Sequence, residues 1–200
     1  MEAIGASGEK RSRSPEQTSR AQEGEASVSQ FEDHVKSSCL HAFTFDYFVL
    51  GVVEEAGEVA TAASKSKPGS HCARVAQELG DLLWYATAVR VSLEDEPLAS
   101  WPVAADGEAE SKTDRMFTRP VDLVVLASKL AGRTKKAIRG DMALDAFLPD
   151  LRMYVRQVLG CCADVASGHG LTLSQCALSN MRKLEDRRRR GTIRGEGDDR

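Results

Sequence analysis

The feature that most constrains this chain is the stretch 48–89, which holds two helix-length segments that each carry two carboxylates three residues apart. The first pair is Glu55 and Glu58, and the second is Glu78 and Asp81. Residues three apart on a helix lie on one face, so each pair projects as a unit. If the two helices pack antiparallel across the short turn between them, the four acids converge.

Both acidic pairs lie within apolar sequence, which is not expected of a purely solvated helix face. Valines flank the first pair, and leucines with Trp84 and Tyr85 flank the second. A single pair of this kind on a helix surface is usually a solvated face, whereas two pairs on neighbouring helices favour a shared site. Converging carboxylates repel one another unless a cation lies among them, and hard oxygen ligands select Mg²⁺, with Mn²⁺ as the alternative.

These residues resemble a known family. The order GVVEEAGEV, a spacer from Val59 to Gln77 and ELGDLLWYA is similar to the MazG-type, all-α nucleoside triphosphate pyrophosphohydrolases, whose signature is ExxE, a spacer and ExxD. The C-terminal sequence also resembles the closing motifs of that family, N-x-x-K-L-x-x-R and G-x-G-D-x-R. The likeness covers about half of the chain, roughly residues 41–93 and 171–200.

The resemblance implies an all-α, MazG-like helical bundle and a hydrolase that converts a nucleoside triphosphate and water to a monophosphate and diphosphate, as in housecleaning of the nucleotide pool. It implies Mg²⁺, or Mn²⁺, held by Glu55, Glu58, Glu78 and Asp81. Glu54, the extra acid of the first motif, is the candidate general base that deprotonates the attacking water. Retention of all the acids argues for activity.

The resemblance also implies which residues bind the substrate. The triphosphate would be bound by Asn180, Lys183, Arg187 and Arg200. Lys183 and Arg187 are four residues apart and share a helix face, and the fork of a guanidinium group suits phosphate oxygens. The nucleobase pocket has four candidates, Phe45, Tyr47, Trp84 and Tyr85, although each is at least as well suited to core packing. Nothing in the sequence chooses a base.

The composition indicates a protein with a buried core in a reducing compartment. A 42% hydrophobic content over 200 residues is enough to bury a core, and a net charge of −3 does not point to nucleic acid. Five cysteines without a CxxC spacing indicate reduced thiols, hence a reducing compartment, for which we expect the cytoplasm with organelles or nucleus as alternatives. Since no apolar run approaches a membrane span, we expect no membrane partner.

The organisation predicted outside the acidic stretch begins with a disordered tail, residues 1–27, rich in Ser, Glu, Gly and Arg. From Ser29, apolar periodicity predicts a short, aromatic-ended first helix. The stretch of about 94–119 contains prolines and no periodicity, which predicts a mobile linker or an active-site flap. Thr172 and Gln175 form a capping-box pattern that begins the last helix.

A constant offset, which carries Phe48 onto Leu123, aligns 48–88 with 123–163 without a gap. The helical domain, 28–200, then consists of a first copy of about 31–95 and an acid-free second copy of about 120–200, which together form an intrachain pseudo-dimer. In the second copy the four acids are replaced by Leu130, Arg133, Met153 and Arg156. The arginines would either face the charge of the nucleotide or lie exposed. Unrelated amphipathic helices with a shared period are the alternative, and a homo-oligomer is an open expectation.

One alternative function belongs to another class. The segment 182–200 contains eight Lys or Arg residues and five acids. A basic tail of this kind also suits a catalytically inactive interaction or regulatory protein that binds RNA or a protein partner. The interleaved acids and glycines favour a turn-rich strap around the substrate, so nucleic acid is the less expected partner.

Overall fold

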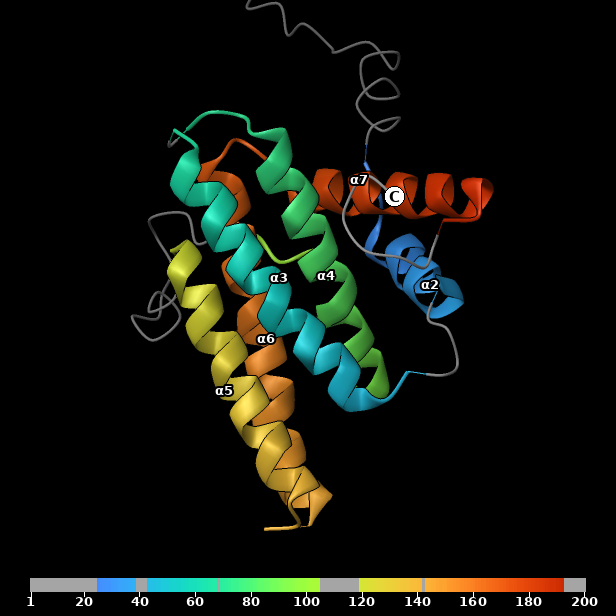
Figure 1. The fold of residues 1–200 in the computed structure, drawn as a ribbon, viewed down its shortest axis with the longest axis vertical. Coiled ribbons are helices and arrows are strands. Elements are labelled where there is room, and N and C mark those ends of the chain that lie inside the picture. Colours follow the sequence, from blue (N-terminus) through green and yellow to red (C-terminus); the bar gives the residue numbers. More distant parts are fainter. Residues whose placement is uncertain (1–24, 39–42, 68, 105–118, 142, 193–200) are drawn as a thin grey trace, which may run out of the picture.

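The computed structural model describes residues 25–38, 43–67, 69–104, 119–141 and 143–192. These residues form six helices and no strand, so the all-α prediction is confirmed (Figure 1). The helices are α2 (Val28–Ser38), α3 (Phe45–Lys65), α4 (Ala73–Ser92), α5 (Pro120–Ile138), α6 (Leu144–Gly168) and α7 (Leu173–Arg190). None of them combines the length and the hydropathy that crossing a bilayer requires.

Two antiparallel hairpins, α3–α4 and α5–α6, build a four-helix bundle. Helix α3 packs against α5, and α4 packs against α6 (Figure 1). The turn between α3 and α4 is joined to the end of α6 because the backbone N–H of Gly69 donates to the carbonyl of Gly168 at 2.9 Å. Gly69 has φ of 75°, a left-handed conformation that glycine adopts without strain.

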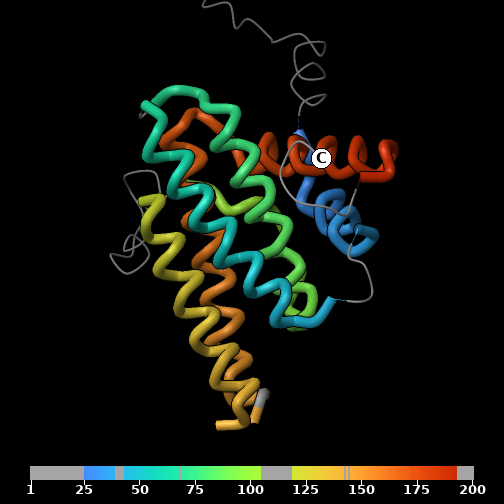
Figure 2. Tube along the Cα trace, viewed as in Figure 1, coloured from blue at the N-terminus to red at the C-terminus, as the bar shows by residue number. Residues whose placement is uncertain are grey.

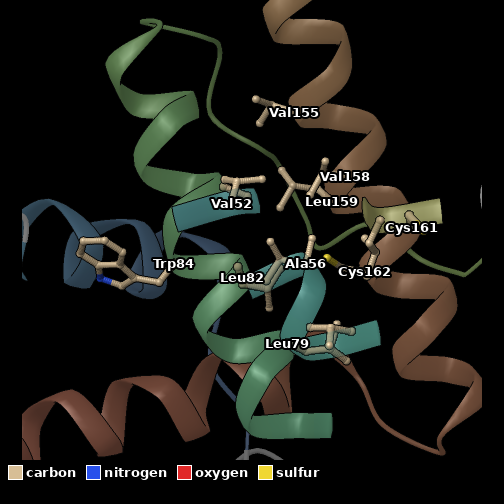
Figure 3. Packing of buried hydrophobic residues seen from close by; sticks show 14 of the residues in the cluster. Val52, Ala56, Leu79, Leu82, Trp84, Val155, Val158, Leu159, Cys161 and Cys162 are labelled. Atoms are coloured by element: carbon tan, nitrogen blue, oxygen red, sulfur yellow. The ribbon is translucent and has the colours of Figure 1, made fainter. Parts of the chain in front are cut away.

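The core of the bundle lies between α3, α4 and α6. Val52 and Ala56 of α3 meet Leu82 of α4 and Leu159 of α6 in Figure 3, and all four are at most 1% exposed. Burying an aliphatic side chain of this size stabilises the fold by about 1.5–3 kcal/mol. The core therefore fixes the crossing of α3 and α4, which is where the predicted site lies.

Helix α7 runs across the bundle instead of along it, with α2 beside it (Figure 2). It begins with the predicted capping box, in which the Gln175 N–H donates to the Thr172 hydroxyl at 3.2 Å and the Thr172 N–H donates to the Gln175 side chain at 3.0 Å. Its C-cap is Gly191, with φ of 68°. Because α7 packs on α4, it reaches the second acidic motif.

Helix α2 is held to α4 by a buried ion pair between Glu32 and Arg90. It ends at Ser38, so the prediction that the first helix ends in the aromatic run is wrong: Phe45 begins α3 instead. The Trp101 indole N–H donates to the carbonyl of Ala26 at 2.8 Å, which places both residues against this corner. The predictions for residues 1–24 and 105–118, and for Arg200, lie outside the described residues.

Candidate metal centre

Three carboxylates meet where α3 crosses α4. Glu55 and Glu58 come from consecutive turns of α3, and Glu78 comes from the start of α4. One oxygen of each lies within 4.8 Å of the other two. Glu78 is fully buried, Glu55 is half-buried and Glu58 is exposed. The acids therefore form a short path of oxygen ligands from the core to the surface.

This arrangement fits a divalent cation with oxygen ligands. Because Mg²⁺–oxygen distances are about 2.0–2.1 Å, ligands on opposite sides of the ion lie about 4.2 Å apart, comparable to the spacing found here. The Glu55 Oε2 atom is buried and has no hydrogen-bond partner among the residues that the structure describes. Burial, together with the negative charges of Asp81 and Glu58, raises the pKa of Glu55 to about 9. A buried carboxylate in this environment needs either a proton or a cation.

Asp81, the fourth predicted ligand, lies next to this cluster but is bound by the protein. The Asn180 side-chain amide donates to Asp81 Oδ1 at 2.6 Å, and the Lys183 ammonium forms an ion pair with Oδ2. Both partners come from α7, and Asn180 is only 3% exposed. The structure therefore brings together three of the predicted ligands and gives the fourth two partners that were predicted to bind phosphate.

Gly80 explains how α7 comes so close. A Cβ atom at this position would lie 2.6 Å from the carbonyl oxygen of Cys176 and 3.0 Å from the Cβ of Asn180. Separations this short force atoms apart, so only glycine allows the two helices to approach to this distance. The glycine of ELGD thus allows Asn180 on α7 to reach Asp81, the residue that follows Gly80.

Sequence reasoning missed Arg74, which bridges two of the clustered acids. Its guanidinium forms an ion pair with Glu78 and lies 3.8 Å from Glu58 Oε2. The side chain of Arg74 is 50% exposed, so the cation reaches the cluster from the solvent side. The signal that would have found it is the spacing of four residues between Arg74 and Glu78 on one helix.

An aromatic surface lies beside the acids. The rings of Phe43 and Tyr47 stack with centroids 4.1 Å apart, and both residues are 37% exposed. The hydroxyl groups of Tyr47 and Tyr85 are 3.3 Å apart. Tyr85 lies over Gly51, where a Cβ would fall 2.2 Å from its ring. Burial raises the pKa of Tyr85, and the nearby negative charges of Glu55 and Glu54 raise this pKa as well. The aromatic surface therefore adjoins the acids.

The remaining predicted residues have different positions. Trp84 lies in the core: it is 8% exposed, points away from Leu82 toward α2 (Figure 3), and its indole N–H donates to the Ser38 hydroxyl at 2.9 Å. Glu54 is exposed on α3, outside the three-carboxylate cluster. Arg187 of α7 is 5% exposed, so its side chain is buried and not presented to solvent.

The candidate metal centre does not lie in the larger of two clefts found among the described residues. That cleft, of about 670 Å³, lies between α3, α5 and α6 and is lined by residues such as Thr61, Asp164 and His169. None of the four motif acids lines it. The three-carboxylate cluster therefore lies outside that cleft and reaches solvent through Glu58, which is exposed.

Comparison of the chain with family models, with curated proteins and with solved structures finds no match in any of the three. The functional interpretation consequently depends on the residues and their geometry.

Proposed function

We propose that this protein is a Mg²⁺-dependent nucleoside triphosphate pyrophosphohydrolase of the MazG-like type, which releases a nucleoside monophosphate and diphosphate. The observation that carries the proposal is the three-carboxylate cluster, which includes Glu55, a residue with a buried oxygen that has no hydrogen-bond partner among the described residues. Its neighbours are the cationic Lys183 and the Tyr47 and Tyr85 rings. An acid cluster with a cation and aromatic rings nearby suits a nucleotide whose phosphates are bound to a metal ion.

In this proposal the chain positions both ends of the nucleotide. The base stacks on the exposed Phe43 and Tyr47 rings. The hydrogen bond between the hydroxyl groups of Tyr85 and Tyr47 holds Tyr47 in place. Lys183 and Asn180 orient Asp81, and Lys183 presents positive charge toward the phosphates. A bound Mg²⁺ supplies charge neutralisation on the phosphate oxygens.

The reaction needs a base for the attacking water. Water adds to the α-phosphorus, the bond to the bridging oxygen of the β-phosphate breaks, and diphosphate leaves with that oxygen. Glu54 accepts the water proton in this scheme, because it is an exposed carboxylate that immediately precedes Glu55 on α3.

We further infer that α5–α6 is a degenerate copy of α3–α4, so that the chain is an intrachain pseudo-dimer with one metal site. The helix bounds support this. The offset that carries Phe48 onto Leu123 also carries α3 onto 120–140, compared with Pro120–Ile138 for α5, and carries α4 onto 148–167, compared with Leu144–Gly168 for α6. The packing of α3 on α5 and of α4 on α6 matches two hairpins related by a pseudo-twofold axis.

The residues that replace the acids in the second copy differ in their surroundings. Leu130 is fully buried, and Met153 is 42% exposed. Arg156 donates to both oxygens of Asp95, at 3.1 and 2.7 Å. The charge of Arg156 is thus paired with a carboxylate of the same chain, in the loop that follows α4.

The test is pyrophosphate release from each NTP and dNTP with Mg²⁺ by the purified chain and by a Glu58→Gln variant. Because loss of a residue supporting a metal ligand typically costs 10–100-fold, we expect loss of a ligand to cost more than about 100-fold. Glu94→Gln, the same change at an exposed acid after α4, serves as the control and should remain active. No release from any nucleotide would overturn the proposal and favour the inactive interaction protein.

A further inference from the structure

We propose that Arg74 is a built-in competitor of the divalent cation: its guanidinium binds two of the ligand carboxylates and must leave them when metal binds. The inference rests on the proposed metal site. It assigns to Arg74 a role that the acidic motifs do not contain, namely control of the metal concentration at which the site fills.

The geometry places Arg74 on two of the candidate ligand carboxylates. Its guanidinium is paired with Glu78 Oε1, and its NH2 lies 3.8 Å from Glu58 Oε2. Both acids belong to the three-carboxylate cluster. A guanidinium group presents several donors in a fixed fork, so it can contact carboxylates from two helices at once, as a metal ion does. Guanidinium and metal therefore compete for the same carboxylates.

The other cation at the site has a different position. Lys183 is paired with Asp81, which is not one of the three clustered carboxylates. Its side chain is 16% exposed, against 50% for Arg74. Metal binding can therefore leave the Lys183–Asp81 pair in place, whereas it has to displace Arg74. Displacement is easy because Arg74 lies in the first turn of α4 and can swing into solvent.

Two opposite effects follow when Arg74 is neutralised. Without metal, the carboxylates lose a counter-charge, so the protein becomes less stable. With metal, nothing has to be displaced and one positive charge fewer repels the ion, so affinity rises. A purely structural role would weaken both properties together.

The experiment measures binding of Mn²⁺ alone, without nucleotide, by titration calorimetry at low ionic strength. It compares the wild type with Arg74→Gln, Arg74→Lys and a control, Arg189→Gln. Arg189 is an exposed arginine of α7 whose pair with Asp186 at 3.0 Å lies outside the acid cluster. Thermal unfolding of each protein in a chelator provides the second measurement.

We expect Arg74→Gln to bind Mn²⁺ about two- to fivefold more tightly, as loss of a half-exposed ion pair implies, and to unfold at a lower temperature in the chelator. Arg74→Lys should lie between this variant and the wild type, and Arg189→Gln should match the wild type. Unchanged or weaker Mn²⁺ binding by Arg74→Gln, with binding abolished in Glu58→Gln, overturns this inference alone. If the wild type binds no Mn²⁺, the proposed metal site fails together with it.

Discussion

Arg133 on α5 and Asp150 on α6 form an ion pair of 2.9 Å that mirrors, with reversed charges, the contact between Glu58 and Arg74. The offset that relates the two hairpins carries Glu58 onto Arg133, and it carries Arg74 onto the position immediately before Asp150. Each hairpin thus has an acid–arginine contact near the same crossing, but the second hairpin lacks counterparts of the other three motif acids. The proposed metal site therefore belongs to the first hairpin alone.

Asn180 is expected to position Asp81 for activity. Asn180→Ala removes the 2.6 Å hydrogen bond and leaves a buried carboxylate oxygen without that donor. We expect pyrophosphate release to fall about 10–100-fold and the free energy of unfolding to fall by about 1–3 kcal/mol. Steady-state kinetics and urea unfolding measure the two effects. Ser179→Ala, at the exposed neighbour, should change neither; equal activity of both variants would contradict the role.

Gly80 and Gly132 give a matched pair of substitutions with opposite expected signs. Gly80→Ala drives a methyl group into the Cys176 carbonyl, so we expect a loss of about 1–3 kcal/mol in stability and a loss of metal binding as α7 moves away. Gly132→Ala has no atom within 4 Å and should stabilise α5 by about 0.5–1 kcal/mol. The denaturant midpoints of the two variants measure these changes in stability. A Gly80→Ala variant as stable as the wild type would show that the helices are not in close contact.

Glu55 makes the metal-free protein less stable as pH rises. Its pKa is about 9 in the folded chain and near its ordinary value of 4.5 in the unfolded chain, so the folded state keeps a proton that the unfolded state releases. The contribution is fully present below pH 4.5 and is lost as pH rises through about 9.

Glu55→Gln mimics the protonated carboxyl and should remove this pH dependence. In a chelator at pH 8 we expect the variant to be more stable than the wild type by about 1–3 kcal/mol, with little difference at pH 4. Urea unfolding at the two pH values measures this, and Glu54→Gln, at an exposed acid, is the control. Parallel pH profiles for wild type and Glu55→Gln would contradict the prediction.

The Glu32–Arg90 pair should be a strong anchor for α2, because their side chains are only 10% and 2% exposed. Glu32→Gln leaves the Arg90 charge buried and uncompensated, so we expect a loss of about 3–5 kcal/mol. Replacing both residues with apolar ones of similar size should recover part of it. Lys36→Ala, which removes the half-exposed partner of Glu32, should cost at most about 1 kcal/mol. Thermal unfolding ranks the three variants.

The sequence predicted what depends on local patterns. Apolar periodicity located the acidic helices, and the spacing of three placed Glu55 and Glu58 on one face, where they meet Glu78. The capping box located the start of α7 because Thr172 and Gln175 act within four residues. These features are determined by neighbours along one helix, so they can be recognised before any packing is known.

What escaped prediction depends on contacts between distant segments. The sequence did not predict that Asn180 and Lys183 hold Asp81, a contact that forms because Gly80 lets α7 lie against α4. Trp84 packs in the core because α2 supplies Ser38 as the acceptor for its indole N–H. No periodicity encodes such pairs, since each is set by how helices meet.

The late position of α7 also governs how the site is made. Asp81 and its two helix partners are 99 and 102 residues apart in the chain. A ribosome therefore releases the acid-bearing hairpin well before it has synthesised the groups that hold Asp81. A nascent or truncated chain that stops short of α7 carries the motif acids without the two side chains that hold Asp81, so we expect the proposed centre to be complete only after α7 has been synthesised.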